Sequence, residues 1–118
     1  MSHTTTVACE FNDEQAIVDA CKRLGLPAPT KGVHKLFDEN TATGLGVKLE
    51  GWVFPVVIDT AKGEAYYDNY GGSWGKPVHF DRFKQAYAVE RAKRQARKQG
   101  LRVREKVQQD GSIQLICQ

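Results

Sequence analysis

The sequence predicts a single α+β domain in which a mainly antiparallel sheet of five to seven strands carries two amphipathic helices on one face. Apolar residues alternate over several short segments, and two longer segments repeat apolar residues at helical spacing. Neighbouring alternating segments are joined by short connections, which favour antiparallel pairing in the order β-α-(β)-β-β-β-α-β-β. A length of 118 residues suits one domain, so we expect residues 1–118 to fold as a unit.

The N-terminal third predicts a strand followed by a helix. Over residues 5–11, apolar side chains alternate with smaller or polar ones, which is the period of a strand with one buried face. Asn12 is placed to cap the helix that follows, and Gly25 is placed to end it.

The middle of the chain predicts up to four strands. Residues 33–37 carry a weak strand pattern, residues 45–49 alternate clearly, and residues 52–58 form a denser apolar run. Because Pro55 cannot donate a backbone hydrogen bond, we expect an edge strand or a bulge in that run. Residues 64–70 follow a turn and complete a hairpin.

The last third predicts a long helix and a β-hairpin. Asp81 is placed to cap a helix that runs to about Gln99. Its expected apolar stripe consists of Phe83, Ala88, Ala92 and Ala96, helped by Tyr87 and Val89. Beyond it, two alternating segments flank Asp110-Gly111, which is the preferred two-residue hairpin turn, and we expect Leu115 to be buried in the last strand.

Basic residues gather on the second helix and after it. The net charge is only +3, yet the segment from Arg82 to Lys106 holds ten basic residues and two acidic ones. Arg91, Arg94 and Lys98 are three and four residues apart and share a helix face. This face is either a surface for phosphates or an acidic partner, or the solvated side of a helix packed on a sheet. On the second interpretation, glutamates at positions 91 and 94 would leave folding nearly intact.

The segment from Tyr66 to Gly75 interleaves aromatic residues with glycines. Tyr67, Asp68, Asn69 and Trp74 are candidate binding residues, because a base, sugar or peptide can stack on aromatic rings while a carboxylate and an amide fix its edge. The alternative is a structural turn in which tyrosines alternate inward and glycines supply positive φ angles. The sequence leaves both interpretations open.

Other site chemistries lack a motif. The three histidines are separated by long gaps, and the three cysteines are odd in number and far apart, which predicts reduced and mostly buried thiols. Neither a nucleophile elbow nor a phosphate-binding glycine loop is present. We therefore expect no metal, no cofactor and no catalytic residue, and the sequence favours a protein that is not an enzyme. Residues 1–6 lack a signal-peptide pattern, so we expect a cytoplasmic protein without a membrane span.

Four segments carry a family resemblance: residues 1–5, 82–89, 96–100 and 110–113. In these the chain resembles the family of small proteins typified by hypothetical chloroplast reading frame thirty-five of algal plastids and cyanobacteria, with members in other bacteria and in phages. The resemblance spans almost the whole chain. The family has no established activity, cofactor or catalytic residue, so the resemblance implies no site, and it agrees with a complete intracellular protein.

These observations lead to three functional hypotheses. The first is a small intracellular, non-enzymatic accessory or adaptor protein that binds a macromolecular partner, expected to be a protein, through the aromatic-glycine segment, the basic helix face, or both. The second is a weak, phosphate-directed nucleic-acid-binding protein. The third is a small-ligand-binding or catalytic domain that uses Asp68, Asn69, Trp74 and His79. The sequence does not indicate an oligomeric state.

Overall fold

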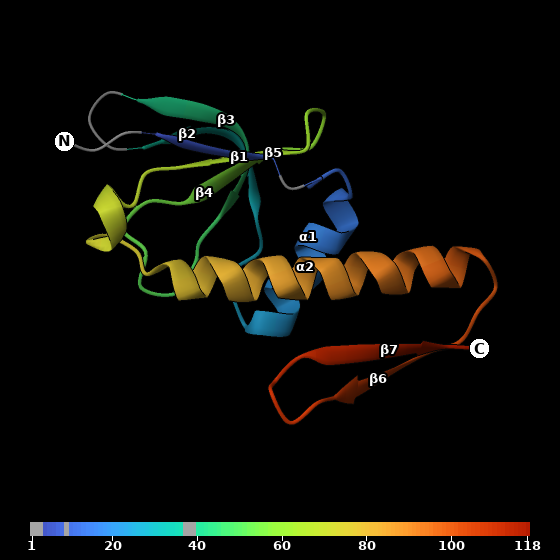
Figure 1. Ribbon diagram of the computed structural model, residues 1–118. Coiled ribbons are helices and arrows are strands. Elements are labelled where there is room, and N and C mark those ends of the chain that lie inside the picture. Colours follow the sequence, from blue (N-terminus) through green and yellow to red (C-terminus); the bar gives the residue numbers. More distant parts are fainter. Residues whose placement is uncertain (1–3, 9, 37–39) are drawn as a thin grey trace.

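The computed structural model describes residues 4–8, 10–36 and 40–118 (Figure 1). The elements in chain order are β1 (Thr5–Ala8), α1 (Glu14–Leu24), β2 (Thr30–Lys35), β3 (Thr41–Val47), β4 (Val56–Asp59), β5 (Glu64–Tyr67), a 3-10 turn η1 (Tyr70–Gly72), α2 (Pro77–Lys98), β6 (Val103–Val107) and β7 (Ile113–Cys117). The predicted class and the predicted order of strands and helices are confirmed. Residue 37, at the end of the predicted strand 33–37, lies outside the described residues.

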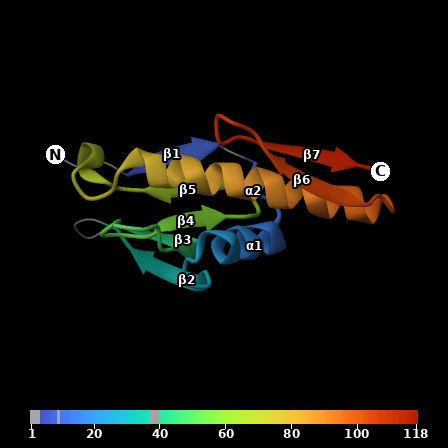
Figure 2. The ribbon, with the colours of Figure 1, turned by 90° about the horizontal axis from the view of Figure 1, so that it is seen from below.

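The strands form two separate antiparallel sheets. Five strands pair in the order β1-β5-β4-β3-β2, and β6 pairs with β7 in a second sheet. Both helices lie on the same side of the larger sheet, and the β6–β7 hairpin lies on the far side of α2 (Figures 1 and 2). The long helix therefore sits between two β layers, with the chain's C-terminal end outermost.

The first helix begins one residue later than the sequence suggested. Asp13, not Asn12, is the N-cap, and its side chain accepts a hydrogen bond from the backbone N–H of Ala16 at 3.1 Å. The Asn12 amide instead donates to the carbonyl of Thr60 at 3.0 Å, which ties the helix start to the β4–β5 turn. Gly25 ends the helix in the left-handed region, as predicted.

The second helix begins four residues before its predicted cap. Pro77 occupies the first turn, where its missing N–H has no helical partner to lose and its fixed φ suits the helix. Asp81 is consequently inside the helix, where it pairs with Lys84 at 3.2 Å. The helix ends at Lys98, close to the predicted end.

Aromatic rings join α2 to the larger sheet. Phe80, Phe83 and Tyr87 line one face of α2, and Phe11 packs on all three, with its ring centre 4.8 Å from that of Tyr87. Buried residues of α1 and of strands β3 to β5 complete this core. The predicted stripe was therefore partly wrong: Ala88 is exposed and Ala92 is half-buried, because the larger rings turn the helix onto a neighbouring face.

Two strand predictions are corrected by the pairing. β4 starts at Val56 and lies between β3 and β5, so it is a central strand. Pro55 immediately precedes the strand, so its missing backbone N–H leaves no gap in the hydrogen bonds between strands. The reason to expect an edge strand or a bulge is therefore removed. In the terminal hairpin, Gln108 N–H donates to the Ser112 carbonyl at 2.8 Å, so the loop has three residues, with Gly111 at φ 87°.

Neither helix in the described ranges has the length and apolar content that a bilayer crossing needs.

The core assignment predicts unequal losses on truncation. Phe83 is fully buried, whereas Leu115 in β7 is half-buried and not the core residue expected from its alternation. Phe83→Ala should lower the free energy of unfolding by about 3–5 kcal/mol. Leu115→Ala should lower it by about 1 kcal/mol, because part of that side chain already contacts water. Urea denaturation followed by Trp fluorescence measures both, and equal losses would contradict the assignment.

Candidate functional site

The segment from Tyr66 to Gly75, called here the aromatic-glycine loop, is folded by its own polar groups. Asp68 is 2% exposed, and its Oδ1 accepts a hydrogen bond at 3.1 Å from the backbone N–H two residues later. The Asn69 side chain donates to the Gly75 carbonyl at 3.0 Å, and the Asn69 carbonyl accepts from the Trp74 N–H at 2.9 Å. The two polar candidates hold the turn, a common role of Asp and Asn in loops. Oδ2 of Asp68 is buried without a hydrogen-bond partner among the described residues.

The aromatic candidates pack against other rings. Tyr67 is half-buried and meets the rings of Trp52 and Phe80 at 5.3 and 5.2 Å. Trp74 stacks on Tyr70, with ring centres 4.6 Å apart and planes 18° apart. Tyr67 therefore contributes to the core, and Tyr70 covers a face of Trp74 that a stacked ligand would need.

The histidine and cysteine side chains described by the structure lie outside the aromatic-glycine loop. His79, in the first turn of α2, has its Nδ1 4.0 Å from a carboxylate oxygen of Glu50. Cys21 is buried, and burial raises the pKa of its thiol to about 11, whereas Cys117 is exposed. His3 and Cys9 lie outside the described residues. Within the ranges that the structure describes, no three His, Cys, Asp or Glu side chains gather as metal ligands would.

The predicted basic helix face points toward the start of α1. Arg94 Nε donates to both carboxylate oxygens of Asp13, at 2.9 and 3.1 Å, and Arg91 lies 3.4 Å from Glu10. Lys98 is exposed in the last turn of the helix. Two of the three predicted binding cations are thus paired with acids of the same chain.

Asp13 is the centre of this contact. Burial alone would raise the pKa of Asp13, but hydrogen bonds from Arg94 and the Ala16 N–H, together with the charges of Arg94 and Lys98, outweigh it and lower the pKa. Ionised Asp13 therefore caps α1 and holds α2 at the same time.

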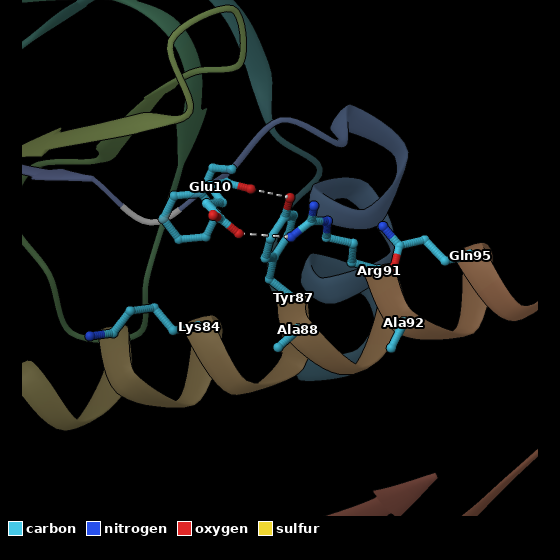
Figure 3. A pocket seen from close by; sticks show the side chains of 8 residues that line it. Glu10, Lys84, Tyr87, Ala88, Arg91, Ala92 and Gln95 are labelled. Carbon is cyan, nitrogen blue, oxygen red and sulfur yellow. Dashed lines mark hydrogen bonds and ion pairs between the residues drawn. The ribbon is translucent and has the colours of Figure 1, made fainter. Parts of the chain in front are cut away.

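A hollow of about 350 Å³ lies beside this contact (Figure 3). Its lining consists of Glu10, Phe11, Lys84, Tyr87, Ala88, Arg91, Ala92 and Gln95. At one side, the Tyr87 hydroxyl donates to the Glu10 carbonyl at 2.9 Å, and the Glu10 carboxylate faces Arg91. Because the Glu10 carboxylate and the Arg91 guanidinium lie together there, this side of the hollow is neither clearly positive nor clearly negative.

A second ion-pair network attaches the terminal hairpin to both helices. Arg23 of α1 contacts Glu90 of α2 at 3.0 Å and also bonds to Glu105 of β6. Lys93 of α2 contacts Glu105 at 2.9 Å and Glu90 at 3.5 Å. Hydrogen bonds from Arg23 and Lys93, more than their charges alone, lower the pKa of Glu105 to about 2. The two acids of the basic C-terminal segment are therefore neutralised inside the fold.

A row of exposed cations lies on the other side of the hairpin. Side chains alternate along β6, and the backbone pair of Arg102 with Gln118 continues the ladder by one residue before the strand. Glu105 therefore points toward α2, while Arg102, Arg104 and Lys106 point away from it. All three are exposed, and in the described part of the chain none has an acidic partner within 4.0 Å. Their cross-strand partners complete what we call the hairpin outer face: Arg102, Arg104, Lys106, Gln114, Ile116 and Gln118.

Arg104 and Lys106 on this face were not among the predicted binding residues. The helical spacing of Arg91, Arg94 and Lys98 drew attention to α2, but which acids lie opposite a helix is a tertiary property. A signal was nevertheless present, because residues 102–106 alternate basic side chains with Val103 and Glu105.

Comparisons with protein-family models, with curated proteins and with solved structures gave no match. The family resemblance stays a prediction.

The hairpin network predicts stability that is sensitive to acid. Because the pKa of Glu105 falls from 4.5 to about 2 on folding, its ionised form stabilises the fold above about pH 4.5, and this contribution is lost as the pH falls toward 2. Glu105→Gln should lower the free energy of unfolding at neutral pH by about 1–2 kcal/mol and flatten its decline in that window. Glu50→Gln is the control, since the Glu50 side chain is 79% exposed. Identical acid titrations of the two variants would refute the network's role.

The contact at Asp13 predicts that the two helix arginines are not simple surface charges. Arg94→Glu would place a carboxylate beside Asp13 and should lower the free energy of unfolding by about 1–2 kcal/mol. Arg97→Glu makes the same charge change at an exposed position of the same helix and should cost less than about 0.5 kcal/mol. Chemical denaturation compares them. If both variants unfold alike, the expectation of a solvated face at positions 91 and 94 holds after all.

Proposed function

We propose that this chain is a non-enzymatic accessory protein that binds nucleic acid through phosphate contacts made by the hairpin outer face. The observation that carries the proposal is a row of exposed cations without acidic partners among the described residues: Arg102 just before β6, and Arg104 and Lys106 on it. Neighbouring cations in such a row stand about 7 Å apart, because side chains on one face of a strand recur every two residues. A row of this kind suits a repeating polyanion.

The charge arrangement around the row supports the same partner. Glu90 and Glu105 are held by Arg23 and Lys93, so the acids of this region do not oppose an approaching phosphate. Asp110 lies in the connecting turn, where its carboxylate accepts hydrogen bonds from Ser112. Arg97 and Lys98 lie exposed at the end of α2 and add to the positive field near the start of the hairpin.

Other hypotheses have less support. A protein partner docked on the aromatic-glycine loop or on Arg91 and Arg94 would meet side chains already engaged within the chain. A small-ligand site built on Asp68 and His79 would need polar groups that converge on a cavity. Asp68 instead holds a turn, and the hollow that His79 lines with Glu50 and Arg82 includes no residue of the aromatic-glycine loop.

The proposal predicts salt-dependent binding that depends on the hairpin. Fluorescence anisotropy with a labelled duplex of about 20 base pairs should detect binding at low ionic strength, with affinity that falls steeply as salt rises. Arg104→Glu with Lys106→Glu should weaken binding at least tenfold. The same variant should reduce the salt slope by about two, because each phosphate neutralised by a cation contributes about one to that slope.

Lys48→Glu with Lys62→Glu is the matched control, because both lysines are exposed and lie outside the hairpin. This variant carries the same net charge and should bind almost as the parent protein does. Undetectable binding by the parent protein at low salt would reject the proposal, and so would equal losses in the two double variants.

A further inference from the structure

We propose that the β6–β7 hairpin enters the major groove of B-form DNA with its outer face toward the bases. This rests on the proposed function above and names the class of nucleic acid. A two-stranded antiparallel ribbon has strands about 4.8 Å apart, and the major groove of B-DNA, about 12 Å wide, admits such a ribbon. The hairpin is a separate two-stranded sheet, and no other strand of the described ranges widens it.

The hairpin is presented outward as an isolated ribbon. In Figure 1 the hairpin forms the lowest layer, and α2 lies between it and the five-stranded sheet. The Glu105 carboxylate is held there by Arg23 and Lys93, and Gln85 reaches the Gly111 carbonyl at 3.4 Å near the turn. Since the ribbon is attached to the helices at its middle and near its turn, binding need not order it first, which lowers the entropic cost of docking.

The side chains of the outer face match base edges as well as phosphates. Arg104 is opposite Ile116, and Lys106 is opposite Gln114. Arginine pairs with the O6 and N7 acceptors of guanine, glutamine pairs with the N6 and N7 atoms of adenine, and an apolar side chain suits the thymine methyl group. The Gln108 amide donates to Gln114 Oε1 at 2.8 Å, which restrains the glutamine best placed to read a base.

The same face is poorly suited to other nucleic acids. Residues 101–118 contain no Phe, Tyr, Trp or His, so the hairpin offers no ring on which the unstacked bases of a single strand could stack. The major groove of A-form RNA is deep and narrow, and side chains do not read it. Double-stranded DNA is therefore the partner that this surface fits.

The test compares three probes of one base sequence: duplex DNA, duplex RNA and single-stranded DNA. At moderate salt, duplex DNA should bind at least tenfold more tightly than either of the others. Replacing the purine N7 atoms of the duplex by carbon removes acceptors found only in the major groove and should weaken binding several-fold. Arg104→Ala with Gln114→Ala should remove most of the preference for DNA, whereas Lys62→Ala should leave it unchanged.

The outcomes separate this inference from the proposed function. Equal affinity for duplex DNA and duplex RNA, or no effect of the N7 substitution, would overturn docking in the major groove while leaving phosphate binding in place. Absence of binding to all three probes at low salt would reject both. Circular dichroism of each variant checks that its fold is retained, which is expected because both substituted side chains are exposed.

Discussion

The whole structure depends on α2 burying side chains on two opposite faces. Phe80, Phe83 and Tyr87 pack into the core beneath the five-stranded sheet. Val89 and Ala96 are also buried, but they lie outside that cluster, on the side that carries Lys93 toward the hairpin. A two-stranded hairpin is marginally stable on its own, so the helix supplies the surface that it needs. One helix thereby joins the five-stranded sheet to the two-stranded one.

The ion pairs around α2 decide which charges the protein offers to a partner. Arg94 pairs with Asp13, and Arg91 pairs with Glu10. Glu90 and Glu105 form ion pairs with Arg23 and Lys93. These pairs join elements distant in the chain. The contacts of Asp13, Glu90 and Glu105 lie in partly buried positions, where charges interact more strongly than in open water, whereas Glu10 is exposed. Because the acids are used internally, a chain with a small net charge carries an exposed face of one sign.

Much of the fold was predictable because periodicity reports which side chains are buried. The alternating segments became strands, the helical spacings became helices, and Gly25 ended the first helix where expected. The errors concern groups with several competing partners. Asn12 and Asp13 were both able to cap α1, and contact with the β4–β5 turn decided between them. Asp81 has the side chain of a helix cap, but Pro77, whose fixed φ suits the first turn of a helix, starts α2 four residues earlier.

The candidate site divides in the same way. Composition and spacing alone determined that the C-terminal segment is basic and that its last part is a hairpin, because charge and alternation are properties of the chain itself. Only the tertiary structure decided which cations stay available. Arg91 and Arg94 face acids contributed by the segment before α1, whereas Arg104 and Lys106 face away from α2. Local sequence cannot settle this, since the field at a side chain depends on groups that folding brings near from far along the chain.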